Sequence, residues 1–384
     1  IGPVLSDAAA ANEAQGALTD ETVKLLVETG VAHFWVPRQF GGSEATPLEG
    51  LATVEALAYA DAATGWVVMA WQLATATAAA YLRAEGAESL FGDGIPLIAG
   101  SGVPSGRAEV DGSGYRLTGT WRYGSGILNS RYAHSAAFVY DGDTPRVMPG
   151  SKAREVVTLI TPVEELELCG GWDGVLGLRA TGSVDYRIND VLVPLERVHA
   201  HNADVALRGG ELYRLGVFGM VTLLHSAWAL GVGRRALDEL ARLARDEDLR
   251  ASVIAPRAGD EAFREHFARG EGRFRAARTF VVDAQSKIET TIIAGEPMST
   301  RQVSLARLAL NHVTATVAEI GTLAYLYGGG TALRPGTLQR CFRDIFTGTQ
   351  HISTASTVLH DVGRELLDLA DGMRWGPIGL SGGA

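Results

Sequence analysis

The sequence has little cysteine and no concentration of positive charge. Its 384 residues include only Cys169 and Cys341, which are far apart and lack the Cys-x-x-Cys spacing of zinc and redox sites. We therefore expect neither a disulfide framework nor a metal site, and a reducing, cytoplasmic environment fits best. The net charge is −10 and no run of Lys and Arg is present, which argues against a nucleic-acid partner.

Long uninterrupted apolar runs are also missing. The longest, residues 308–327, contains Asn311 and Glu319, so it predicts a buried helix of a bundle and not a membrane span. Residues 1–16 lack the basic and apolar regions of a secretory signal. We therefore expect a soluble protein with no membrane segment.

Three blocks of different composition follow one another along the chain. Residues 1–92 contain Ala-rich, Leu-spaced segments interrupted at Pro37, and they predict helices. Residues 93–206 are richer in Gly, Val, Thr and Tyr, with short alternating runs and a turn signal at Asp111-Gly112, and they predict an antiparallel β-domain. Residues 207–384 return to long Ala, Leu and Arg stretches, which predict a helical bundle.

Six stretches, spread over nearly the whole chain, carry a family resemblance. They are residues 36–42, 55–66, 114–121, 123–126, 177–183 and 340–351. Together they resemble the acyl-CoA dehydrogenase superfamily, and within it the two-component flavin-dependent monooxygenases such as the p-hydroxyphenylacetate and secosteroid-phenol hydroxylases. The resemblance implies an α+β fold with an N-terminal α-domain, a middle antiparallel β-barrel-like domain and a C-terminal four-helix bundle. It also implies a homotetramer, with flavin bound between the β-domain and the bundle.

The last of these stretches separates two kinds of chemistry. Dehydrogenases of the superfamily carry a glutamate base after an Arg-Asp pair, but residues 346–351, which follow Arg343-Asp344, contain no carboxylate. An imidazole, with an unperturbed pKa of about 6.5, can accept or donate a proton near neutrality. The resemblance therefore implies oxygen chemistry, with His351 as the acid–base residue. A histidine held in a structural hydrogen bond is the simpler alternative.

The loop that ends the predicted strand 114–121 provides the second catalytic candidate. In the oxygenases the matching serine is thought to hold flavin N5 and stabilise the C4a-hydroperoxide, which implies that role for Ser125, while the following glycine permits close backbone approach. For Ser125, the alternative is a hairpin turn that binds no ligand. For Arg343, a structural salt bridge is as consistent with the sequence as a flavin contact. The residues expected to contact the flavin are Trp121, Tyr123, Ser125, Gly126, Trp172, Arg179, Thr181, Ser183 and Arg343.

The expected substrate residues, Trp66, Trp71 and Gln72, fall on a segment that resembles a substrate-cavity wall. The same Ala- and Trp-rich face is equally consistent with ordinary core. Some phenol-hydroxylating relatives place a substrate-binding histidine in this region, but the chain has none between His33 and His134. The choice between carbon, nitrogen and sulfur oxygenation therefore stays open.

Two absent motifs bear on the cofactor. Residues 245–263 lack the Arg-x-x-Phe-Gly motif with which dehydrogenases hold the ADP half of FAD, and no GxGxxG follows a strand. We therefore expect diffusible reduced FMN or FAD, supplied by a separate NAD(P)H:flavin reductase, together with O2 and a small aromatic or heteroatom-bearing substrate. The alternatives are an N-oxygenase of an amino compound, a divergent acyl-CoA dehydrogenase or oxidase with a base such as Glu319, and a flavin-free scaffold.

Overall fold

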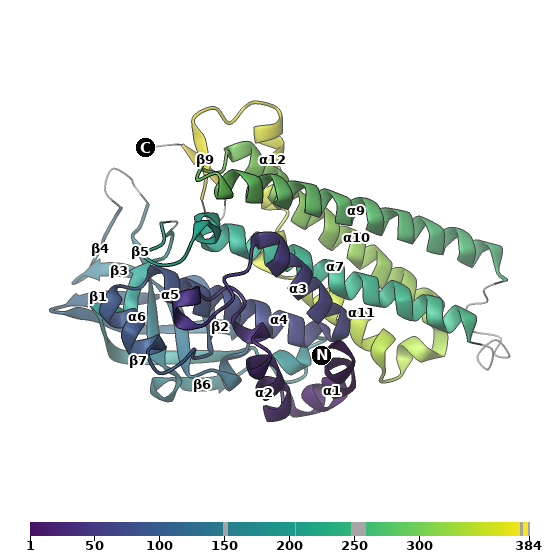
Figure 1. Cartoon of the computed structure of the whole chain (residues 1–384), viewed down its shortest axis with the longest axis horizontal. Coiled ribbons are helices and arrows are strands. Elements are labelled where there is room, and N and C mark those ends of the chain that lie inside the picture. The colour runs from purple at the N-terminus through teal and green to yellow at the C-terminus, as the bar shows by residue number, and fades with distance from the viewer. Residues whose placement is uncertain (149–152, 204, 247–258, 377–378, 383–384) are drawn as a thin grey trace.

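The computed structural model describes residues 1–148, 153–203, 205–246, 259–376 and 379–382. Residues 247–258, which make up most of the segment 245–263 that lacks an ADP-binding motif, lie outside these ranges. Helices come first along the chain, then a sheet, then helices again (Figure 1). This order is the predicted one.

The N-terminal helices pack into a hydrophobic core that they share with the sheet and the bundle. Side-chain caps define where three of them begin: Thr19 accepts from the Thr22 amide at α2, Thr46 and Glu49 form a reciprocal capping box at α3, and Asp61 accepts from the Thr64 amide at 3.0 Å at α4. After Trp71 the helix widens into one π-helical stretch, Gln72–Ala76. The helices are α1 Gly2–Gln15, α2 Asp20–Glu28, α3 Pro47–Ala60, α4 Ala62–Trp71, α5 Thr77–Tyr81 and α6 Ala84–Phe91.

The middle block forms one eight-stranded sheet in the order β6-β7-β2-β1-β3-β5-β8, with β4 paired to β3. All pairs are antiparallel except β1 with β3. β3 runs opposite to β2, which precedes it, and it pairs with β1 on the edge away from β2. It therefore runs parallel to β1, and the fully antiparallel prediction was wrong for this pair. The strands are β1 Ile98–Asp111, β2 Gly114–Gly124, β3 Tyr132–Asp141, β4 Thr144–Pro145, β5 Val156–Pro162, β6 Glu167–Gly170, β7 Val184–Pro194 and β8 Val198–Ala200.

The C-terminal helices α7, α9, α10 and α11 pack together as a bundle beside the sheet (Figure 1). Within the described residues, one helical segment, 211–245, is long and apolar enough to cross a membrane, and most of it is buried in the protein interior. The helices are α7 Gly216–Arg245, α9 Glu261–Ile293, α10 Thr300–Leu333, α11 Thr337–Gly348 and α12 Thr357–Leu366, followed by the short strands β9 Met373–Trp375 and β10 Leu380–Gly382.

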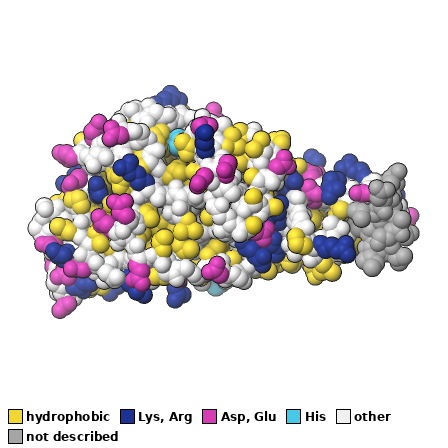
Figure 2. Space-filling view, turned by 90° about the horizontal axis from the view of Figure 1, so that it is seen from below, with side chains coloured by type: hydrophobic (Ala, Val, Ile, Leu, Met, Phe, Trp, Pro, Cys, Tyr) yellow, Lys and Arg dark blue, Asp and Glu magenta, His cyan; other side chains and the backbone are white. Residues whose placement is uncertain are grey.

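The three blocks share one buried hydrophobic cluster. Leu57 from α3, Trp121 from the sheet and Trp228 from α7 all belong to it. Basic and acidic side chains are interspersed over the face seen in Figure 2. The elements change type at residues 91–98 and 200–216, close to the domain boundaries at 92 and 206 that we propose from the sequence.

Candidate active site

Ser125 is buried where the end of β2 meets α4 and β7. Its Oγ lies 2.6 Å from Ser183 Oγ and accepts a hydrogen bond from Trp66 Nε1 at 3.1 Å. Gly126 next to it has φ +78°, and a Cβ there would lie 2.8 Å from Trp71 Nε1, so only glycine fits. The loop is therefore tightly packed against α4.

A chain of three hydroxyl groups fixes the direction of the Ser125 hydrogen bond. Thr181 donates to the Leu178 carbonyl at 2.8 Å, so the proton between Thr181 and Ser183, 2.6 Å apart, belongs to Ser183. Because Ser183 has then used its only proton, Ser125 must donate to Ser183. With one lone pair taken by Trp66, Ser125 Oγ keeps one acceptor position for an external donor.

His351 follows α11 and lies mostly buried against aromatic rings. Its Nδ1 accepts from the Ser353 amide at 3.3 Å, so in the neutral ring Nε2 carries the proton. The ring centroid is 5.7 Å from that of Trp66 and 4.0 Å from that of His225. Burial, and then the neighbouring His225, hold the pKa of His351 well below its usual value. His351 is thus a neutral hydrogen-bond donor at pH 7.

Trp66 connects the two predicted catalytic residues. Its N–H bonds Ser125, and its ring meets His351 edge to face. The structure therefore brings Ser125 and His351 to one indole ring, although they are far apart in the sequence. That both face a bound flavin stays a prediction.

His225 on α7 belongs to the same group of rings and was missed by the sequence reasoning. Its centroid lies 5.1 Å from that of Trp66, and Trp228, one turn later, lies 5.0 Å from Trp66. Burial lowers the pKa of His225 to about 4. Its sequence signal was a histidine in a mostly apolar stretch, residues 217–233, which gives no indication of its neighbours.

The expected flavin-contact residues divide into exposed and buried ones. Tyr123 is 62% exposed, has a left-handed φ of +63°, and packs edge-on to Trp172 at 6.0 Å. Trp121 is fully buried, donates to the Ala136 carbonyl at 2.8 Å and stacks on Tyr186. The sheet encloses this side chain, so the expected flavin contact of Trp121 stays a prediction that gains no support from its position.

Arg343 and Arg179 hold the loop before β7 in place. Arg343 pairs with Glu13 at 2.7 Å and donates to the Leu176 carbonyl at 3.3 Å, while Arg179 donates to the Val175 carbonyl at 2.9 Å. In the same region Asp344 Oδ1 accepts from the Leu178 amide at 2.6 Å, and burial raises its pKa to about 7. These bonds favour the structural alternative for Arg343.

Trp71 and Gln72 are fully buried and support neighbouring loops. Trp71 Nε1 donates to the Gly126 carbonyl at 3.3 Å and to Ser130 Oγ at 3.1 Å. The Gln72 amide bonds the backbone of Ala32 and Trp35 with its two ends. Their polar groups are used inside the core, which fits the ordinary-core alternative for these two residues, and their substrate contact stays an untested expectation. Trp66, by contrast, is only partly buried.

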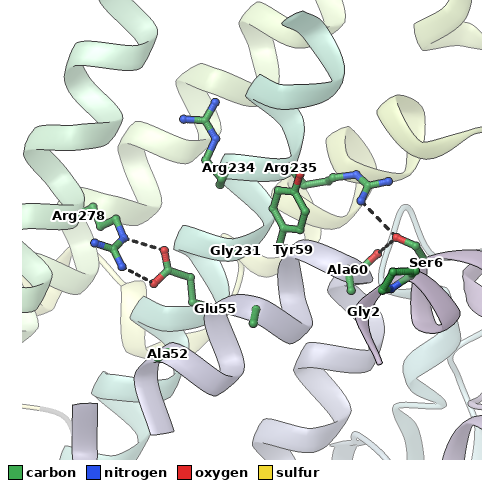
Figure 3. A pocket seen from close by; sticks show the side chains of 12 residues that line it. Gly2, Ser6, Ala52, Glu55, Tyr59, Ala60, Gly231, Arg234, Arg235 and Arg278 are labelled. Carbon is green, nitrogen blue, oxygen red and sulfur yellow. Dashed lines mark hydrogen bonds and ion pairs between the residues drawn. The ribbon is translucent and has the colours of Figure 1, made fainter. Parts of the chain in front are cut away.

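A cavity of about 610 Å³ lies away from these residues, among α1, α3, α7 and α9 (Figure 3). Its basic side chains are already paired: Arg278 bonds Glu55 at 2.8 and 3.0 Å, Arg234 bonds Glu271 at 2.7 Å, and Arg235 pairs with Glu239 at 3.1 Å. It therefore offers no free cation to an anionic ligand. Across the described ranges, no cluster of three or more His, Cys, Asp or Glu could hold a metal ion.

Comparisons with known proteins agree with this architecture. Residues 4–90 match the acyl-CoA dehydrogenase N-terminal domain and residues 223–356 its C-terminal domain. The chain is 29% identical over 349 residues to indole-3-acetate monooxygenase of Pseudomonas putida, covering 87% of this chain and 83% of that one. It is 28% identical over 393 residues to the flavin-dependent monooxygenase oxygenase subunit HsaA of Rhodococcus jostii, covering 97% and 98%. Its fold resembles XiaF from Streptomyces sp., solved with FADH2 and glycerol, with a TM-score of 0.83 and 23% identity over 96% of this chain and 93% of that one.

Proposed function

Because the chain belongs to the acyl-CoA dehydrogenase family, we propose that it is the oxygenase component of a two-component flavin-dependent monooxygenase. It takes reduced FMN or FAD from a separate NAD(P)H:flavin reductase and uses O2 to oxygenate a small aromatic substrate. The observation that carries the proposal is the neutral imidazole of His351 against Trp66 and His225. Relatives named as monooxygenases, similar over most of this chain, support it.

A dehydrogenase reaction requires a carboxylate over the substrate α-carbon. The alternative base, Glu319, is not at the site of His351. Glu319 is well exposed on α10 and forms a salt bridge with Arg273 on α9. It therefore lies on the outside of the bundle. The side chains that pack on His351, Trp66 and His225, are not acids. These contacts favour oxygenation over dehydrogenation.

The residues present fit a reduced flavin. Ser125 keeps one acceptor position, which suits the N5–H group that reduced flavin has and oxidised flavin lacks. The exposed ring of Tyr123 and the partly buried ring of Trp172 provide apolar surface for the isoalloxazine beside it. A non-glycine residue with a left-handed φ, as at Tyr123, is typical of ligand-binding sites. When bound, the flavin supplies the reaction with O2.

His351 holds and positions a proton in this proposal. Its protonated Nε2 can donate a hydrogen bond, while the amide of Ser353 keeps the ring in that tautomer. The indole ring of Trp66, backed by that of Trp228, covers one side of the imidazole and shields it from water, which strengthens each hydrogen bond inside the site. Its role is therefore to donate a hydrogen bond and to orient the group that accepts it.

We also propose a homotetramer in the cytoplasm. Large apolar side chains stay exposed at the ends of α10 and α12, with Leu326 70%, Leu333 66% and Leu367 70% exposed. Exposed apolar side chains of this kind are typical of surfaces that pack on another subunit. Light scattering coupled to size-exclusion chromatography measures the mass, and a monomer would contradict this part of the proposal.

The experiment that tests the function is rapid mixing of the protein and reduced flavin with oxygenated buffer. We expect a spectral species between reduced and oxidised flavin that decays slowly, with faster decay in a Ser125→Ala variant. Free reduced flavin is the control. If the protein leaves the reoxidation spectra and rates of free flavin unchanged with both FMN and FAD, the oxygenase proposal is wrong.

A further inference from the structure

His225 is a buried histidine with one nitrogen that has no hydrogen-bond partner. The residue is 5% exposed, and its Nδ1 lies 2.8 Å from the Val221 carbonyl. A carbonyl only accepts, so Nδ1 carries the proton and Nε2 carries the lone pair. Within the described residues no group donates to Nε2. A buried acceptor without a donor is costly, so a donor that reached this atom would stabilise the site.

The N–H groups around His225 are used elsewhere. Trp66 gives its N–H to Ser125, and Trp228 gives its N–H to the Ala62 carbonyl at 2.8 Å. His351 lies over the face of His225, with centroids 4.0 Å apart and planes inclined by 30°. Because the lone pair of an imidazole nitrogen lies in the plane of its own ring, the stacked His351 cannot donate to it. The missing donor must come from outside this group of rings.

Donor and acceptor positions next to two indoles define the chemistry of the missing partner. His351 offers Nε2–H, and His225 offers the lone pair of its own Nε2. We propose that His225 Nε2 accepts a hydrogen bond from an O–H or N–H group on the aromatic substrate, and so selects phenols or indoles over their methylated counterparts. This inference rests on the proposed function and specifies the substrate class.

The protonation state of His225 suits an acceptor. Burial lowers its pKa to about 4, so the imidazole is neutral and its lone pair is available at pH 7. The same burial makes it a weak base. His225 therefore orients the substrate through a hydrogen bond and does not take its proton in the ground state.

Binding ratios test the inference. Dissociation constants are measured by anaerobic calorimetry on the full chain with reduced FAD, for indole against 1-methylindole and for phenol against anisole. We expect the wild type to prefer the unmethylated member of at least one pair about tenfold, the effect of one hydrogen bond. His225→Phe should bring that ratio close to one. His225→Gln, which keeps an acceptor of similar reach, should retain most of it.

A matched control is His199→Phe. His199 is also buried with an unpartnered Nε2, but it packs on Tyr81 and His134. Its variant should keep the wild-type ratio. The inference is overturned by any of four results. The wild type binds both members of each pair equally, or binds no probe. Alternatively, His225→Phe keeps the wild-type ratio, or His199→Phe loses it. If His225→Phe does not fold, the wild-type and His225→Gln ratios decide. Failure of the oxygenase proposal is seen separately, in the oxygen-mixing spectra of the wild type without substrate.

Discussion

Replacing Ser183 by alanine tests the directed chain of hydroxyl groups behind Ser125. Ser183 is 2% exposed and lies 2.6 Å from both Ser125 and Thr181. The variant loses two hydrogen bonds, each with a net worth of about 0.5–1.5 kcal/mol, so the free energy of unfolding should fall by about 1–3 kcal/mol. Ser125 is then free to turn its proton elsewhere and no longer presents a fixed acceptor. Affinity for reduced flavin should therefore fall about tenfold.

Anaerobic titration of reduced FMN and FAD measures the affinity, and urea unfolding measures the stability. Thr181→Ser is the matched control, because it keeps a hydroxyl at the end of the chain and should bind reduced flavin like the wild type. A Ser183→Ala variant that loses stability but binds reduced flavin with wild-type affinity would refute the argued link between Ser183 and the acceptor state of Ser125. The hydroxyl chain would then be purely structural.

Three further perturbations follow from the packing. A Cβ at Gly348 would lie 2.3 Å from the Trp228 ring, so Gly348→Ala should lower the free energy of unfolding by about 1–3 kcal/mol in urea melts, while the open Gly363→Ala should not destabilise. Burial lowers the pKa of His134 to about 3 and those of His199, His201 and His225 to about 4, so the unfolded chain binds more protons below about pH 6.5. The contribution of these neutral histidines to the free energy of unfolding is present above that pH and is lost towards pH 4. It outweighs the opposite contribution of Asp344, whose pKa is raised. A Tm that stays flat over this range in calorimetry contradicts the prediction. Trp66→Phe removes the donor to Ser125 but keeps an aromatic ring. The rate of steady-state product formation should fall about tenfold, and the free energy of unfolding should fall by about 1 kcal/mol. A wild-type rate in this variant would argue against a role of the contact in turnover.

Local sequence patterns predicted the order of elements because each depends on near neighbours. Alternation and the Asp111-Gly112 turn signal mark β1 and β2, and Gly112 has the positive φ that such a turn uses. The parallel pairing of β1 with β3 depends on which edge β3 joins, and no local pattern specifies that choice.

The end of β2 shows where alternation fails. Trp121 and Tyr123 lie two residues apart on β2, so a regular strand would put them on one face. The left-handed backbone at Tyr123 breaks the alternation, and one ring is buried while the other is exposed. Sequence reasoning had no signal for this turn at a tyrosine.

His225 illustrates the part of the site that sequence could not supply. The motif comparison pointed to Ser125 and His351 because each lies in a recognisable stretch. His225 becomes a candidate site residue only in the folded chain, because α7 brings it against Trp66 of α4 and His351 after α11. Gln72 shows the opposite case, since its segment suggested a substrate contact while the structure shows its amide bonded to the backbone of residues 32–35.

The position of Trp66 makes the two predicted catalytic residues energetically interdependent. Because one indole bonds Ser125 and packs on His351, a substitution at either end changes the restraint on the other. Double-mutant cycles between the two positions should therefore be non-additive, and they should become additive once Trp66 is replaced by alanine. Coupling through a shared neighbour in this way requires no movement of the backbone.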